Sequence, residues 1–241
     1  MMMKLIRLVI YVSFVHLFFI NYVYADNVCT STPAKYEVTM KKVELCTSSA
    51  CTTTTVLAEK DGTFDIASAS AGADVGSWIT GYALEIGTTY THIKATINST
   101  FTIKGTCSNG EHGLDSCTTI GTPTVAASSG SSPAATAEVA SSVAAADMSW
   151  MVPNKADADN GAFYGATVAT TFEANGITKV NDAATFTWIG ALSSSYTPTA
   201  SSAPKITIKF DVTNQFQHHL YSADVCGIYV KPPTVGVTLT D

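Results

Sequence analysis

Three short patterns in the sequence carry side chains that could do chemistry, and the first is the acidic segment 154–163, NKADADNGAF. Carboxylates ahead of a glycine are typical of calcium loops. An EF-hand that turns at Gly161, however, needs oxygen ligands at the positions of Ala156 and Ala158. The EF-hand is therefore excluded, which leaves either a polar turn between strands or a looser calcium site. That looser site would take its ligands from Asp157, Asp159 and Asn160.

The other two patterns are a histidine pair and a Ser-x-x-Lys spacing. Neighbouring residues of a strand point to opposite faces, so His218 and His219 do not chelate one metal from a strand. Ser202 and Lys205 have the spacing of serine acyltransferases, but that motif begins a helix, and here Pro204 lies inside a Ser-Ala loop. The sequence also contains no nucleotide-binding or metalloprotease fingerprint. We therefore expect no enzyme and no cofactor.

Aromatic residues form the remaining candidate site. Flat rings stack on the faces of sugars, so four of them could make a glycan-binding platform if they are exposed. In a small β-protein the same residues more often fill the core. The four candidates are Trp78, Trp150, Trp188 and Tyr196.

The beginning of the chain predicts export. Lys4 and Arg7 precede an apolar run from Leu8 to Ile20, which is the order of a secretory signal peptide. We expect a signal helix over residues 1–25, with cleavage after Ala25. The rival reading is a membrane anchor, since the apolar run nearly reaches the length that spans a bilayer. Cleavage predicts a secreted, cell-surface or periplasmic protein with no stable membrane insertion.

Charge excludes one class of partner. Loss of residues 1–25 removes two basic residues and no acid, so the net charge falls from -6 to -8. Nucleic-acid binding depends on Lys and Arg, which release counterions from the phosphates. We therefore expect no nucleic-acid partner. Charged residues make up only 13% of the chain, so Thr, Ser, Ala and Gly must cover much of its surface.

Six cysteines follow the signal, and an even number in an exported chain indicates disulfides. Cys46 and Cys51 flank one tight loop, and Cys107 and Cys117 flank a Gly-rich turn. Elimination then pairs Cys29 with Cys226. The chain contains no C-x-x-C pair, so its cysteines do not indicate a metal site or a redox site.

Short period-two segments dominate the mature chain. Tyr36, Val38 and Met40 alternate with polar residues, and the apolar positions then slip by one, which indicates a β-bulge or a turn near Lys41 and Lys42. Further strands are expected at 52–58, 63–67, 78–86, 90–97, 100–104, 148–152, 163–172, 184–189, 205–213, 225–230 and 234–239, with a turn at 60–62 and a flexible loop at 68–77.

This pattern predicts an all-β fold, an antiparallel β-sandwich of jelly-roll or Ig-like type that is stapled by disulfides. The sandwich would occupy residues 26–241 as one domain. A Ser/Ala-rich segment at 121–147 alternatively divides it into two, 26–120 and 148–241. No amphipathic helix of ordinary length is evident after the signal.

Export, low charge and the lack of catalytic motifs together predict a structural protein of the cell surface. We expect a self-associating subunit of a filament, pilus-like fibre or coat, and the alternative is an adhesin or carbohydrate-binding module. The C-terminal tail offers one means of association, since after Pro232 and Pro233 it could leave its own sheet and complete a neighbour's. The apolar side chains of this strand-exchange tail are Val235, Val237 and Leu239.

Overall fold

The computed structural model describes residues 28–69, 71–107, 117–121, 135–138, 144–152, 154, 172–222 and 225–241. Four predictions lie outside these residues: the signal peptide, most of the segment 121–147, the calcium loop of Asp157, Asp159 and Asn160, and almost all of the strand expected at 163–172. None of the described helices has the length and apolar character needed to cross a membrane.

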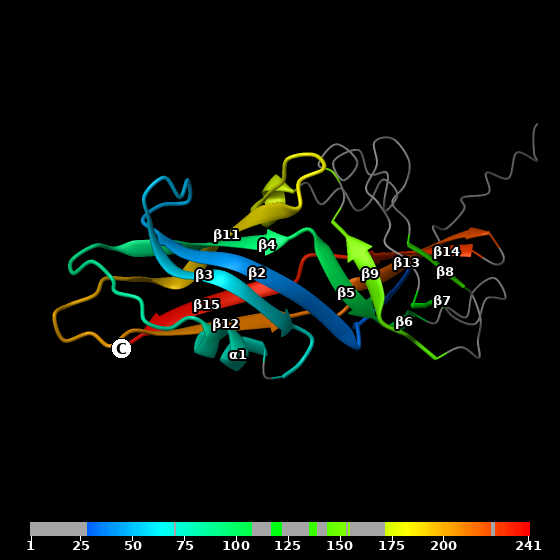
Figure 1. The fold of residues 1–241 in the computed structure, drawn as a ribbon, viewed down its shortest axis with the longest axis horizontal. Coiled ribbons are helices and arrows are strands. Elements are labelled where there is room, and N and C mark those ends of the chain that lie inside the picture. The colour runs from blue at the N-terminus through cyan, green and yellow to red at the C-terminus, as the bar shows by residue number, and fades with distance from the viewer. Residues whose placement is uncertain are drawn as a thin grey trace, which may run out of the picture.

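The fold is mostly antiparallel β-structure with one short α-helix, as Figure 1 shows. The first half contains β1 (Val28–Ser31), β2 (Lys35–Cys46), β3 (Thr54–Asp65), α1 (Ala71–Trp78), β4 (Tyr90–Asn98), β5 (Thr100–Lys104), β6 (Thr106–Cys107) and β7 (Cys117–Thr118). The second half contains β8 (Ala135–Glu138), β9 (Met148–Met151), the 3-10 turn η1 (Glu173–Asn175), β10 (Ile177–Thr178), β11 (Thr185–Tyr196), β12 (Lys205–Asp211), β13 (Phe216–Ser222), β14 (Val225–Val230) and β15 (Thr234–Thr240).

Strand β2 organises the largest sheet, and the slip in its apolar pattern is a β-bulge. Met40 lies opposite Ile97 of β4 and Lys42 lies opposite Thr96, so Lys41 is the extra residue. This confirms the irregularity predicted near Lys41 and Lys42. Because the bulge restores the alternation, Val43 and Leu45 return to the buried face, where both are 0% exposed.

The predicted turn at Lys60-Asp61-Gly62 is wrong, because β3 runs through it without a break. Lys60 and Asp61 together face Lys41 of β2 as a second bulge, and Asp61 forms an ion pair with Lys41 at 2.6 Å. Gly62 serves a contact rather than a turn. A Cβ atom there would lie 2.6 Å from Nε1 of Trp78, so only glycine lets that indole approach the strand.

The prediction for residues 68–86 is also wrong. The expected flexible loop contains α1, and the expected strand from Trp78 to Ile86 is irregular after the helix ends at Trp78. The even spacing of the large residues there reflects the packing of separate side chains. Tyr82 and Leu84 pack against the core, whereas Ile86 is 64% exposed.

The strands form a curled sheet that nearly closes on itself (Figure 1). Hydrogen-bonded ladders join β3, β2, β4 and β11 in that order, and a separate ladder joins β12 to β15. Strand β15 lies beside β11, where Ser193 Oγ donates to the Val237 carbonyl oxygen at 2.9 Å. Helix α1 contacts both β12 and β3 and so fills the remaining gap. The jelly-roll or Ig-like sandwich stays a prediction.

An aromatic cluster fills the interior of the curl. The ring of Phe101 lies 5.5 Å from that of Tyr36, 5.9 Å from that of Trp150 and 6.0 Å from that of Phe186. These rings border an apolar cavity of about 100 Å³. The rings come from β2, β5, β9 and β11, so the core joins strands from both sides of the segment 121–147 in one sheet.

A second group of short strands lies at one end of the molecule, on the right in Figure 1. Strands β1, β13, β14 and β8 form a four-stranded sheet, and the β6–β7 ladder lies beside it. Segments far apart in the chain meet here. Four of the six cysteines belong to these strands, so this end is where long-range disulfides would act.

Burial of Tyr36 predicts a loss of stability at alkaline pH. Desolvation raises the pKa of this phenol above its ordinary value of about 10. The folded chain therefore keeps the proton that the unfolded chain releases. The contribution of the protonated Tyr36 to the free energy of unfolding is fully present below about pH 10. Above that pH it falls by up to about 1.4 kcal/mol for each further pH unit. Denaturant titrations at about pH 8 and about pH 11 should show the loss, and Tyr36→Phe should reduce it.

The same variant loses the hydrogen bond from the Tyr36 hydroxyl to the Lys231 carbonyl oxygen, which is 3.3 Å long. We therefore expect Tyr36→Phe to cost about 1 kcal/mol or less near neutral pH. An alkaline loss of equal size in both proteins would show that Tyr36 is not its source.

Candidate functional site

The gap between β12 and β3 is the main candidate site. These two strands are the ends of the curled sheet, and they do not pair with each other. On one side of the gap, α1 packs directly on the backbone of β12. A Cβ atom on Gly72 would lie 2.0 Å from the Ile208 carbonyl oxygen, and one on Gly76 would lie 3.3 Å from that of Ile206. Gly72 thus lets the helix approach the strand to a distance that a larger residue there forbids, and Gly76 leaves a close but tolerable contact.

These contacts also identify a free strand edge. The carbonyl groups of Ile206 and Ile208 point toward α1 and away from β15, the strand with which β12 pairs. Within the described residues, no backbone hydrogen bond joins β12 to α1 or to β3. The helix therefore covers the hydrogen-bonding edge of β12 without pairing with it.

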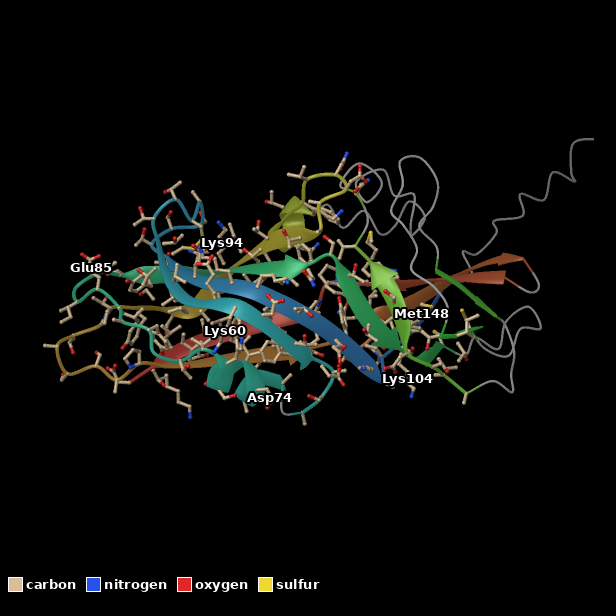
Figure 2. All side chains as sticks on the ribbon, viewed as in Figure 1. Lys60, Asp74, Glu85, Lys94, Lys104 and Met148 are labelled. Carbon is tan, nitrogen blue, oxygen red and sulfur yellow. A yellow bond between two sulfur atoms is a disulfide. The ribbon has the colours of Figure 1, made fainter. Side chains whose placement is uncertain are left out.

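On the other side of the gap, Trp78 holds the end of α1 on β3. Its Nε1 donates to the Asp61 carbonyl oxygen at 3.3 Å, and its ring meets Phe64 edge-on at 5.8 Å. Lys60 Nζ lies 6.0 Å from the ring centroid, within cation-π range. Figure 2 labels Lys60 on β3 and Asp74 on α1, the two elements that meet here. In the described part of the chain, the only strand that pairs with β3 is β2, so the other edge of β3 is covered only by α1.

A groove of about 810 Å³ follows α1 and β12. Small side chains of the helix form one wall, and β12 forms the other with Lys205 and Lys209 at its margin. Beneath it, Ala71 and Val75 of α1 are buried in the core. The helix thus closes the core and leaves a furrow along the strand edge.

The predicted strand-exchange tail is β15, which pairs with β12 over its whole length. Val237 is 0% exposed and Leu239 4%, whereas Val235 is partly buried. The tail is also fastened at its end, since the Tyr196 hydroxyl donates to Asp241 at 2.6 Å. In the isolated chain, the tail therefore pairs with a strand of its own sheet.

The four aromatic residues of the predicted glycan platform do not form an exposed surface. Trp150 is 3% exposed and Tyr196 8%. Trp78 and Trp188 are partly buried against the core. The large hydrophobic side chains exposed in the described residues are Val56, Ile86 and Val180, and none is aromatic. The geometry thus does not favour stacking on a sugar.

The structure contains the expected bond between Cys46 and Cys51, with an S–S distance of 2.08 Å. Cys107 and Cys117 are opposite each other in the β6–β7 ladder, and each belongs to a disulfide. The side chains of Cys29 and Cys226 lie outside the described part of the structure. The predicted pairings of Cys107 with Cys117 and of Cys29 with Cys226 therefore stay predictions.

Helix α1 and a buried polar cluster were not predicted from the sequence. The Gly-x-x-x-Gly spacing of Gly72 and Gly76 was the available signal for a helix that packs closely on another element. The polar cluster joins Asn154, Lys179 and Asp182, which no local motif connects. Among the described residues, no three His, Cys, Asp or Glu side chains gather closely enough to hold a metal ion.

Comparison with known proteins adds no further assignment. The chain matches no family model, no curated protein and no solved structure.

Proposed function

We propose that this chain is an exported structural protein of the cell surface that assembles with copies of itself into a filament or coat. The observation that carries the proposal is the gap between β3 and β12, where two strand edges are held together by α1 rather than by a ladder. The antiparallel sheet, the disulfide at Cys46 and Cys51 and the signal-like N-terminus support an extracellular location.

Assembly would occur by strand addition. An unpaired edge is a template for pairing with another chain, and covering it with a helix is one way in which proteins protect it. If α1 moves aside, the β12 edge of one copy becomes accessible to the β3 edge of the next. The two edges differ, so this contact is heterologous, and a heterologous contact whose rotation does not close a ring repeats into a filament.

The two edges also fit this role in length. Strand β3 has 12 residues and β12 has 7, so the shorter strand can pair along its full length. Movement of α1 is the step that would control assembly. This movement would uncover little of the core, because the buried residues of α1 are only Ala71 and Val75.

The test is to measure assembly of the purified mature protein by analytical ultracentrifugation and electron microscopy. We expect Val56→Lys to reduce assembly, because Val56 is exposed on β3 and a charge on an edge strand opposes pairing. Val180→Lys is the matched control, since Val180 is more exposed and lies on neither edge. Its assembly should equal that of the wild type.

A double variant separates strand addition from exchange of the tail. Thr207 and Thr238 are direct partners in the β12–β15 ladder, so Thr207→Cys with Thr238→Cys can form a disulfide that keeps β15 at home. We expect this protein to assemble normally. Loss of assembly would instead identify exchange of β15. Persistent monomers in the wild type at high concentration would contradict self-association altogether.

A further inference from the structure

The buried cluster of Asn154, Lys179 and Asp182 brings an amine, a carboxamide and a carboxylate together. Asn154 follows β9 and is 3% exposed, and Lys179 follows β10 and is 5% exposed. Lys179 Nζ donates to Asn154 Oδ1 at 3.1 Å. Asn154 Nδ2 in turn donates to Asp182 Oδ1 at 3.1 Å.

Two further features hold Asp182 in a fixed position. Its backbone N–H donates to Asn154 Oδ1 at 2.9 Å, and its φ of 60° lies in the left-handed region that non-glycine residues rarely adopt. Aspartate adopts this conformation more readily than most residues, and here it lies in the turn that is closed by the hydrogen bond from Ala183 N to the Val180 carbonyl oxygen at 3.2 Å. The same residue thus contacts the carboxamide oxygen with its backbone and the carboxamide nitrogen with its side chain.

From this geometry we infer that Lys179 and Asn154 form an intramolecular isopeptide bond without an external reagent. The C=O bond is about 1.2 Å long, so the Nζ atom lies within about 4.3 Å of the Asn154 Cγ atom that it would attack. An amine attacks only in its neutral form, and removal from water favours that form of a lysine. Lys179 is 5% exposed, so its amine is largely removed from water.

The reaction balances within the cluster. The Lys179 nitrogen forms a bond to Asn154 Cγ, and the C=O electron pair moves to Oδ1, where the Asp182 N–H stabilises the developing charge. Once both nitrogens are bonded to Cγ, the Asp182 carboxylate that accepts from Nδ2 can also reach the attacking nitrogen, and it takes one proton from that nitrogen and passes it to Nδ2. The bond between Cγ and Nδ2 then breaks. Ammonia leaves, and an amide joins the two side chains.

Such a bond would lock the sheet. Strands β9 and β10 are the two ends of the order β10-β11-β4-β2-β5-β9, so the amide would link the opposite edges of one sheet. Backbone hydrogen bonds already hold the two segments near each other. Val152 N donates to the Ser99 carbonyl oxygen at 2.7 Å, and Ser99 N donates to that of Ala184 at 2.8 Å.

Mass spectrometry of the reduced, purified protein tests the inference. We expect the wild type to be lighter than its sequence by one ammonia molecule. Trypsin does not cut at an acylated lysine, so segments 105–155 and 156–205 should remain joined in one branched peptide. A full-mass wild type that trypsin also cuts after Lys179, so that 105–155, 156–179 and 180–205 are released as separate peptides, would overturn the inference, whatever the variants do.

The variants assign the chemistry. Lys179→Arg should restore the full mass, and Asp182→Asn should leave most of the chain unlinked. Lys94→Arg is the control, since Lys94 pairs with Glu44 at 3.7 Å and takes no part in the cluster, so it should remain lighter. Asparagine also loses ammonia by closing on its own backbone, without any lysine. An ammonia loss that persists in Lys179→Arg would show that reaction and overturn the isopeptide bond.

Discussion

Replacement of Phe101 by alanine should lower the free energy of unfolding by about 3 to 5 kcal/mol. The ring of Phe101 touches those of Tyr36, Trp150 and Phe186 at the centre of the curled sheet. Its removal would enlarge the apolar cavity that these residues already border. Three neighbouring rings would then lose packing on one side, which adds a cavity cost to the lost burial. Equilibrium denaturation in urea measures the change.

The control for Phe101→Ala is Val180→Ala. Val180 is 74% exposed, so its truncation should change stability by no more than about 0.5 kcal/mol. Equal losses in the two variants would mean that Phe101 does not lie in a packed core. A loss for Phe101→Ala under about 1 kcal/mol would contradict the aromatic cluster in the same way.

Gly72→Ala should destabilise the protein by about 2 to 3 kcal/mol, although alanine is the better helix former. The new Cβ atom would lie 2.0 Å from the Ile208 carbonyl oxygen, which belongs to a strand that is paired with β15 and cannot easily retreat. The helix must therefore move away from β12. We expect the same variant to assemble more readily, because the strand edge that α1 covers becomes accessible.

Gly76→Ala is the matched control, one turn further along the same helix. Its Cβ atom would lie 3.3 Å from the Ile206 carbonyl oxygen, so a shift of a few tenths of an ångström accommodates it. The gain in helix propensity of up to about 1 kcal/mol should offset that shift. Thermal unfolding of both variants decides the matter. If both glycines tolerate alanine equally, α1 does not pack on β12 as described.

The sequence predicted most of the strands correctly where the apolar alternation is strong. The expectation of strands at 90–97 and 100–104 matches β4 and β5, and the slip near Lys41 and Lys42 identified a real bulge. In these segments one face meets the core and the other meets solvent. Period-two alternation follows directly from that environment, so it can be read from a single sequence.

The prediction failed where tertiary contacts decide the local structure. Residues 71–78 are rich in alanine and glycine, which on their own indicate a flexible loop, and they become a helix because that helix closes the gap between β12 and β3. Strand β11 continues to Tyr196 through a Ser-rich stretch, well beyond the strand expected at 184–189. Ser193 there bonds to the backbone of β15, a contact that no local pattern reveals.

The candidate sites show the same division. The individual side chains of the polar cluster were visible in the sequence, but Lys179 lies 25 residues beyond Asn154, and only the fold brings them together. For the aromatic residues the sequence left two readings open, a binding platform or the core, and their burial places Trp150 and Tyr196 in the core. Residue types therefore indicate which chemistry is possible for a chain, and the fold decides which of those residues come together in a site.

Amide hydrogen exchange of the assembled protein against the monomer tests strand addition most directly. If copies join between β12 and β3, the amides of Ile206 and Ile208 on the free edge of β12 should exchange at least about tenfold more slowly in the assembly, along with amides of the β3 edge. The amides of β4, which pairs on both sides in the monomer, should not change. Unchanged exchange along β12 and β3 in assembled material would contradict the account.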